Sequence, residues 1–288
     1  MKFAYIKGHT AVFDVGTMCA VFNVTPAGYY AWLKRPQSAR AIRARELAEQ
    51  IRAVHHEAMG IYGSLKITKE LHHRKVIVNR KTVARLMKGL GIRSKVGRTF
   101  RVQTTDSAHA NPIAPNVLDQ NFASADAPDR VWGVDITYLH TDEGVLYLAG
   151  VVDLYSRRIV GWSMDDSMTT DLVEDAFAAA VLSRKPAPGL LHHSDRGVQY
   201  TSGRYRELLD RHGVEPSMSR TGNCYDNAVV ESFWGKLKTE MVYHEHFATK
   251  EEARAAVFEY IEMFYNRKRL HAALDYLSPE AFEARRVA

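Results

Sequence analysis

The chain of 288 residues is 46% hydrophobic and 25% charged, which is typical of a soluble globular protein with one substantial core and an accessory domain. It contains no run of 18 apolar residues and no secretory signal at its start, so neither a membrane span nor export is expected. Its two cysteines, Cys19 and Cys224, have no CxxC partner, which argues against a disulfide framework or a zinc ribbon and fits a reducing cytoplasm.

The net charge of +6 is unevenly distributed along the chain. Residues 1–110 contain 20 Lys and Arg against 6 Asp and Glu, whereas the remainder contains 19 against 27. A basic segment suits a polyanion, because each neutralised phosphate releases condensed counterions. The alternative is that these cations only solvate a helical domain. The asymmetry favours a nucleic acid as the partner.

Residues 1–103 are predicted to form a helical, basic, DNA-binding region with two helix-turn-helix units. The first unit lies near 18–34, where Thr25 is the predicted N-cap and Pro26 occupies the first helical position. The second lies near 65–91 and consists of the helices Leu65–Arg74 and Arg80–Leu90. The first of these helices carries the apolar positions Leu65, Ile67 and Leu71. The inner face of the second is predicted to consist of Val83, Leu86, Met87 and Leu90.

The second helix of the 65–91 unit begins after a predicted cap, Asn79, and ends at Gly91. Its four cations lie mostly away from the apolar stripe, and they are Arg80, Lys81, Arg85 and Lys88. A major-groove helix keeps its phosphate and base contacts on such a face. A helical bundle with a solvated basic face is the alternative, and the pattern favours contact with DNA.

Residues 104–129 are predicted to be a linker, because prolines and alanines occur there without a sustained period. The following segment, 130–245, changes to β-branched and aromatic runs. Strands are expected at 130–139, 145–153, 158–164, 189–193 and 214–218, and helices at 170–184, at 202–212 and from about 226. This order predicts a mixed α/β sheet. Residues 246–288 are assigned to a C-terminal helical extension.

Three acids of the predicted α/β segment stand out by their positions. Asp135 falls inside an otherwise apolar strand, where an unpaired charge is costly. Asp195 follows a strand, at the end where open α/β sheets place their ligand sites. Glu231 lies on the helix predicted from about Asp226, and Asn227 and Lys238 share its face. Taken singly, each acid is more simply a cap or a solvated side chain.

Carboxylates suit metal-dependent phosphodiester chemistry. Two Mg²⁺ or Mn²⁺ ions about 4 Å apart activate the attacking oxygen and stabilise the leaving oxygen. Hard cations prefer oxygen ligands, and two or three carboxylates leave positions open for water and substrate phosphate.

Pairs of histidines at 55–56, 72–73 and 192–193 are interpreted as structural or phosphate-facing, because adjacent helical residues diverge by about 100° and no cysteine pair completes a zinc unit.

The spacing of the three acids favours a common site. Thirty-five residues separate Asp195 from Glu231, and the acids lie in WGVDITY at 132–138, HSDRGVQY at 193–200 and DNAVVESFW at 226–234. These three motifs, with YNRKRLH and LSP at 265–279, strongly resemble the DDE integrase-core transposases of bacterial insertion sequences. The resemblance covers about residues 20–286 and is nearest to the second-reading-frame (OrfB) proteins of the insertion-sequence-three family.

The resemblance implies an RNase H-like core in which Asp135, Asp195 and Glu231 bind the metal ions. It also implies strand cleavage at the ends of a mobile element, followed by strand transfer into target DNA. Asp153 matches the family and is interpreted as a supporting acid rather than a ligand. Asn227 and Lys238 match positions that approach the DNA end in related integrases.

The resemblance further implies partners, namely the terminal inverted repeats, target DNA and further copies of the chain. An upstream-frame (OrfA-type) protein, separate or fused by frameshifting, is implied as well, and the chain would be associated with the bacterial nucleoid. Two other functions stay open at this point. One is an RNase H-like nuclease or resolvase without strand transfer, and the other is a non-catalytic DNA-binding regulator.

Overall fold

A computed structural model of the chain describes residues 1–96, 112–220 and 227–287 and divides the chain into two compact units, 1–53 and 54–288. The first unit contains α1 (Lys2–Gly8), α2 (Val15–Val21), α3 (Pro26–Lys34) and most of α4 (Ala39–Glu57). As predicted, Thr25 caps α3: its hydroxyl accepts a hydrogen bond from the Gly28 N–H at 3.1 Å. The small core of α1–α3 is formed by Ile6, Met18, Cys19 and Tyr29.

The second unit begins with the other predicted helix-turn-helix, α5 (Ser64–His73) and α6 (Arg80–Gly89). Asn79 caps α6 by accepting from the Lys81 N–H at 2.7 Å, and Gly91 ends the helix with a φ of +67°. Of the apolar positions of α5, Ile67 is fully buried, whereas Leu65 is 39% exposed. Two residues advance a helix by about 200°, so the two side chains face opposite sides.

The remainder of this unit is built on a five-stranded sheet with the order β3-β2-β1-β4-β5. The strands are β1 (Val131–Thr141), β2 (Gly144–Asp153), β3 (Ile159–Asp165), β4 (Leu191–Ser194) and β5 (Glu215–Met218). β1, β2 and β3 are antiparallel neighbours, whereas β4 runs parallel to β1 and β5 parallel to β4. This topology confirms the predicted mixed α/β sheet and the RNase H-like core.

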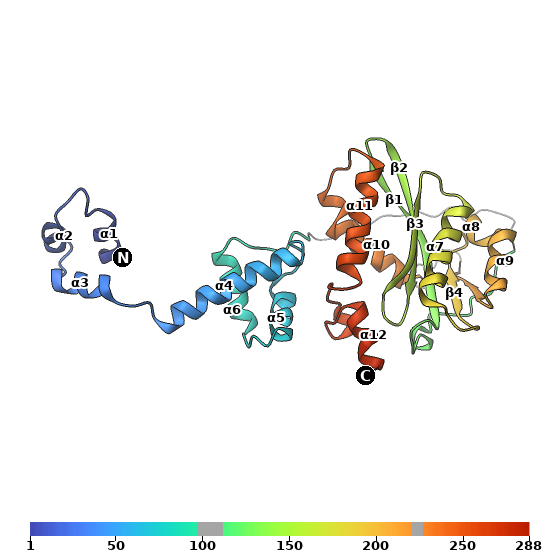
Figure 1. Ribbon diagram of the computed structural model, residues 1–288, viewed down its shortest axis with the longest axis horizontal. Helices are drawn as coiled ribbons and strands as arrows, with labels where there is room; N and C mark the ends of the chain where they lie inside the picture. Colours follow the sequence, from blue (N-terminus) through green and yellow to red (C-terminus); the bar gives the residue numbers. More distant parts are fainter. Residues whose placement is uncertain (97–111, 221–226, 288) are drawn as a thin grey trace. The chain divides into compact units, whose positions relative to one another are not determined.

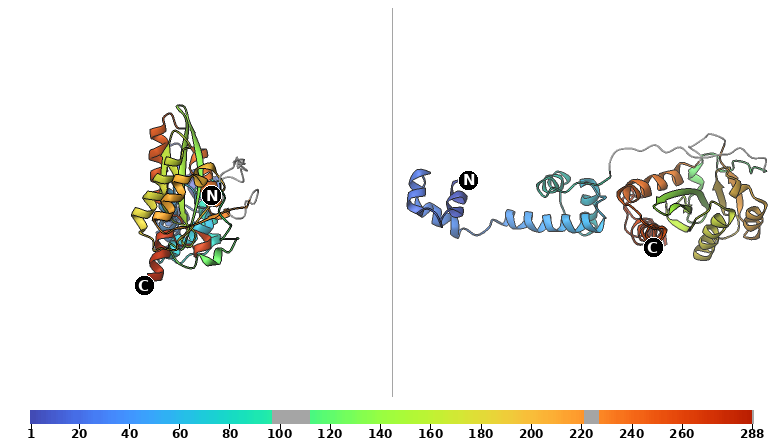
Figure 2. Two further views of the ribbon diagram at one scale, coloured as in Figure 1. Left: turned by 90° about the vertical axis from the view of Figure 1, so that its right-hand side faces the viewer. Right: turned by 90° about the horizontal axis from the view of Figure 1, so that it is seen from above.

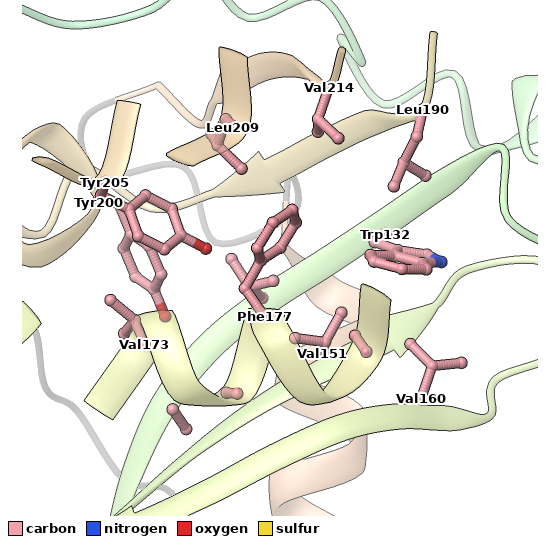
Figure 3. Packing of buried hydrophobic residues seen from close by; sticks show 14 of the residues in the cluster. Trp132, Val151, Val160, Val173, Phe177, Leu190, Tyr200, Tyr205, Leu209 and Val214 are labelled. Carbon is pink, nitrogen blue, oxygen red and sulfur yellow. The ribbon is translucent and has the colours of Figure 1, made fainter. Parts of the chain in front are cut away.

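Helices cover both faces of the sheet (Figures 1 and 2). On one face lie α7 (Thr170–Arg184), α8 (Val198–Thr201) and α9 (Gly203–Arg211), and on the other lie α10 (Ala228–Glu240) and α11 (Lys250–Phe258). The core under α7 is dense in aromatic and branched side chains, including Trp132, Phe177 and Tyr205 (Figure 3). α7 has the predicted bounds, and Asp226, the predicted start of α10, is outside the described residues.

Residues 112–129, predicted to be part of a linker, pack against the sheet. They contain the 3-10 turn η1 (Phe122–Ser124), and Leu118 and Ala125 are buried beside Val131 and Leu191. The apolar side chains among the prolines and alanines are too widely spaced to show a period, which is why the sequence alone did not assign this segment to the core.

The C-terminal segment is helical and irregular. It contains η2 (Val242–His244), the π-helical turn η3 (Glu259–Tyr265), η4 (Ala272–Leu274) and α12 (Pro279–Val287). The Asn266 amide lies against the edge strand β3: it accepts from the Ile159 N–H at 3.0 Å and donates to the Ile159 carbonyl at 2.9 Å. Among the described helices, none combines the length and apolar character that a membrane span requires.

Candidate active site

Asp135 and Asp195 are brought together by the pairing of β1 with β4. Gly133 of β1 is opposite His193 of β4 in a parallel register. The same register continued by two residues places Asp135 level with Asp195, and neighbouring strands are about 4.8 Å apart. Because side chains two residues apart on a strand point to the same face, both carboxylates belong to the face that carries Gly133.

Two glycines let α10 approach this face closely. A Cβ on Gly133 would lie 2.6 Å from Cγ2 of Val230, and a Cβ on Gly150 would lie 2.8 Å from the Trp234 ring. Gly150 is the register partner of Asp135 in the β1–β2 ladder. The Trp234 indole therefore lies beside this acid, and its Nε1 donates to Oδ2 of Asp135 at 3.1 Å.

Glu231 stands on α10 between the two side chains that make these close contacts, Val230 and Trp234. It is exposed, and among the described residues its carboxylate has no hydrogen-bond or ion-pair partner. The carboxylate of Asp195 is held differently, since its Oδ1 accepts from the Gly197 N–H at 2.9 Å. The structure thus fixes the two aspartates and leaves the glutamate free to turn.

The three acids influence one another electrostatically. Burial, the charge of Asp195 and, to a smaller extent, the charge of Glu231 together raise the pKa of Asp135 to about 8, against hydrogen bonds from the Ile136 N–H and Trp234. As the side chains stand, no three His, Cys, Asp or Glu residues in the described part of the chain are gathered closely enough to hold a metal ion.

The two polar neighbours predicted on α10 differ in their surroundings. Lys238 is half-buried, and its Nζ lies 5.1 Å from the centre of the Tyr138 ring. Burial lowers the pKa of Lys238, while the charge of Asp135 favours its cationic form. Asn227, predicted to face DNA, is only 8% exposed, and its Nδ2 donates to the Val134 carbonyl at 3.4 Å. The close approach of α10 to β1 encloses this amide.

The remaining predicted residues of the core have structural contacts. Asp153 is fully buried and accepts from the N–H groups of Asp129 and Ser156 and from the Ser156 hydroxyl, at 2.7 to 2.8 Å. Burial raises its pKa to about 6 against these hydrogen bonds. His192 lies 2.8 Å from the Tyr205 hydroxyl, and Nδ1 of His193 lies 2.9 Å from the Ser217 hydroxyl.

Sequence reasoning missed two aromatic residues of the site. Trp234 follows Glu231 by one helical turn, and its position after an acid on an amphipathic helix gave no sign of a hydrogen bond to Asp135. Tyr200 is 3% exposed, and its hydroxyl has no partner among the described residues. Burial, followed by the charges of Asp135 and Asp195, raises the pKa of Tyr200 well above its usual value, which places this hydroxyl near both aspartates.

The basic face predicted for α6 is open to solvent. All four side chains, Arg80, Lys81, Arg85 and Lys88, are exposed, and the apolar stripe of the helix is turned inward at Val83 and Met87. The arrangement leaves the cations available to a ligand. The histidine pairs of this region make local contacts, for example His72, whose Nε2 lies 2.8 Å from the Val78 carbonyl.

Comparison with known families gives three matches. The family described as integrase core domain matches residues 125–224, a second family of the same description matches residues 231–287, and an HTH-like domain matches residues 43–100. The two integrase matches together cover the sheet, α10 from Glu231 onward and the C-terminal segment.

Curated relatives match along nearly the whole chain. A transposase of insertion sequence IS3A from Escherichia coli is 42% identical over 100% of both chains. A 31 kDa protein of insertion element IS600 from Shigella sonnei is 46% identical over 92% of this chain and 97% of its own. Among solved structures, the magnesium-bound catalytic core of the HTLV-2 integrase covers 55% of this chain at 15% identity, with a TM-score of 0.43.

Proposed function

The chain belongs to the integrase-core transposases of bacterial insertion sequences, in the insertion-sequence-three family, and we propose that Asp135, Asp195 and Glu231 form its catalytic centre. It is a DNA transposase, and therefore a polynucleotidyl transferase. None of these matches favours a nuclease without strand transfer or a non-catalytic regulator. The observation that carries the proposed centre is the β1–β4 register, which sets Asp135 level with Asp195 beneath the helix that bears Glu231.

The three residues fit a pair of divalent cations, Mg²⁺ or Mn²⁺. All three offer carboxylate oxygens, the ligands that hard cations prefer. Three acids near one another are unfavourable without a counter-charge, as the raised pKa of Asp135 indicates. The bound ions would supply activation of the attacking oxygen and stabilisation of the charge that develops at phosphorus.

The chain's own residues provide the geometry for two successive displacements. In the first, a water oxygen bonds to phosphorus at the element's end and the bond to the 3′ oxygen breaks, which releases a 3′-hydroxyl. In the second, that hydroxyl bonds to a target phosphorus and displaces a target 3′-hydroxyl. Trp234 holds Oδ2 of Asp135 in place, and the Gly197 N–H holds Asp195, so both acids are oriented before DNA binds.

A labelled duplex that carries the element's terminal repeat tests this function. We expect cleavage in Mg²⁺ and none in EDTA, and joining of the cleaved strand to a second, unlabelled duplex. Cleavage without joining would indicate a nuclease, and binding without cleavage would indicate a regulator.

Metal binding is expected to release a proton. Asp135, with a pKa of about 8, is mostly protonated at pH 7 in the metal-free chain, and a ligand must be deprotonated. Because the proton competes with the metal, the Kd for Mg²⁺ should fall about tenfold per pH unit between pH 6 and 8 and become constant above. Calorimetry at pH 7 in two buffers of different ionisation enthalpy measures the release. A Kd that is the same at pH 6 and pH 8 would contradict it.

Contact of DNA with α6 is also part of the proposal, with Arg80, Lys81, Arg85 and Lys88 meeting phosphates and base edges. The slope of log K against log salt changes by about 0.9 for each phosphate contact. A variant with all four residues changed to Gln should therefore reduce the slope by up to about 3.6 and keep its melting temperature, since the side chains are exposed. Lys185→Gln with Arg211→Gln is the control on exposed cations outside α6, and its slope should not change. A slope change below about 1 would remove α6 from the interface.

Partners complete the proposed function. The DNA partners are the terminal inverted repeats and target DNA, and two ends must be held together for joint insertion, which calls for more than one copy of the chain. An OrfA-type upstream-frame protein, separate or fused, is the proposed protein partner. Size-exclusion chromatography with light scattering, with and without repeat DNA, measures the number of copies.

A further inference from the structure

A group of half-buried cations lies on the side of α10 away from the candidate active site. Lys236 of α10 is about 200° around the helix from Lys238, and therefore on nearly the opposite face. Lys66 of α5 lies over the ring of Tyr62, whose hydroxyl accepts from the Leu270 N–H, next to Arg269. Arg157 lies in the turn between β2 and β3, and its charge acts on Lys236 as that of Lys236 acts on Lys66. Three separate segments of the second unit thus contribute one cation each.

The acid in this group, Glu240, is already neutralised. Its carboxylate accepts hydrogen bonds from Nε of Arg269 at 2.7 Å, from Nη2 of the same guanidinium and from the Tyr260 hydroxyl at 2.8 Å. The charges of Glu240 and Arg269 cancel, and the charge of Asp153 acts on Arg157, so the three remaining cations leave the group with a net positive charge.

None of the three cations has an ion-pair partner within the described ranges. Nζ of Lys66 lies 5.1 Å from the centre of the Tyr62 ring, and Nζ of Lys236 donates to the Ser232 carbonyl at 3.1 Å. The side chain of Arg157 makes no hydrogen bond to the described chain, although its backbone is held at a φ of +63°. The three charges are therefore available to an anion.

Holding these cations together is unfavourable without an anion. Burial and, after it, the charge of Arg269 together lower the pKa of Lys66 and of Lys236 to about 8 each. His271, buried beside them, has its pKa lowered to about 2 by burial and by the surrounding positive charges. Partly desolvated cations that repel one another gain more from an incoming anion than fully solvated ones do.

We propose that Lys66, Lys236 and Arg157 form a binding site for adjacent phosphates of a DNA backbone, separate from the catalytic centre. This rests on the proposed function in that the polyanion is the DNA on which the transposase acts. The site would hold a strand between the helix-turn-helix α5–α6 and the helix that carries Glu231, and this would fix the distance between bound DNA and the reacting phosphate. The strand belongs either to the element's end or to the target.

The test measures DNA binding by the full chain in EDTA, where no cleavage is required. Lys66→Gln and Lys236→Gln should each reduce the salt slope by about 0.9. In the double variant Lys66→Gln with Lys236→Gln, the slope should fall by about 1.8. The factor by which affinity drops between 50 and 200 mM salt should then be about 12-fold smaller than for wild type. Lys185→Gln is the control, because this lysine is exposed on the opposite side of the sheet at the end of α7. The melting temperature of the double variant should not fall, because the change removes the repulsion between the positive charges of these side chains.

Two duplexes distinguish the source of the strand. A loss of slope with the terminal-repeat duplex alone assigns the site to the element's end, and an equal loss with an unrelated duplex assigns it to target DNA. Unchanged slopes with both duplexes, or a fall in melting temperature that accounts for the lost affinity, would overturn the proposal. Since metal-dependent cleavage by the wild type is measured separately, that result would leave the proposed function standing.

Discussion

Asp135→Asn, Asp195→Asn and Glu231→Gln are each expected to reduce strand cleavage by a factor on the order of a thousand or more. Each change removes a metal ligand at the point where negative charge develops on phosphorus, and each tenfold loss in rate corresponds to about 1.4 kcal/mol of transition-state stabilisation. DNA affinity in EDTA should not fall, because none of the three changes removes a cation that contacts phosphate. Cleavage of a labelled repeat under single-turnover conditions measures the effect.

The folded state provides an independent check on Asp135. Its raised pKa means that the charged form is disfavoured in the metal-free protein, so Asp135→Asn should melt at the same temperature as wild type or higher at pH 8 without metal. Asp210→Asn and Glu245→Gln are controls on exposed acids outside the site. If a variant of Asp135, Asp195 or Glu231 keeps more than a tenth of wild-type cleavage, the changed residue is not part of the catalytic centre.

Much of the fold is predictable from the sequence because its signals are local. The period-2 and period-3.6 patterns locate all five strands and α7 within two residues, and the caps Thr25, Asn79 and Gly91 mark helix ends. The packing of residues 112–129 could not be predicted, since it depends on the Ser217 hydroxyl, which accepts from the Val117 and Leu118 N–H groups about a hundred residues away. Such a contact has no local pattern.

The site is less predictable than the fold. The three acids were identified by their motifs, but the enclosure of Asn227 follows from how closely α10 approaches β1. That distance is set by Gly133 and Gly150, on two different strands. Helical periodicity places Asn227 on the same face as Glu231. It does not predict that β1 packs over the first turn of this helix and buries Asn227. The hydrogen bond from Trp234 to Asp135 depends on the same approach.

The buried pair of Glu240 and Arg269 connects α10 to the C-terminal segment, and its loss should affect stability strongly. Both side chains are 5% exposed. Burial alone would raise the pKa of Glu240, but hydrogen bonds and charge from Arg269 outweigh it and hold the pKa below the ordinary value of 4.5. Tyr62 of the segment before α5 contacts the same region, since its hydroxyl accepts from the Leu270 N–H at 2.7 Å.

Glu240→Gln should therefore destabilise the protein by about 3–5 kcal/mol, because it leaves the Arg269 guanidinium buried without a counter-charge. At about 2–4 °C per kcal/mol for a unit of this size, the melting temperature should fall by on the order of 10 °C. Since the folded-state pKa of Glu240 is depressed, the pair stabilises fully above pH 4.5 and loses its contribution as the pH falls through that lower pKa. The difference between wild type and variant should hold at pH 5 and shrink at lower pH.

A double variant separates charge pairing from packing. Glu240→Leu with Arg269→Met replaces both charges by apolar side chains, and such replacements are often neutral or stabilising, whereas removal of one partner is not. The double variant should therefore recover most of the stability that Glu240→Gln loses. If it melts as low as the single variant, the hydrogen bonds to Tyr260 and His271 rather than the charge pair hold α10 in place. Recovery of stability with cleavage still reduced would indicate that the pair also sets the position of Glu231, nine residues earlier on the same helix.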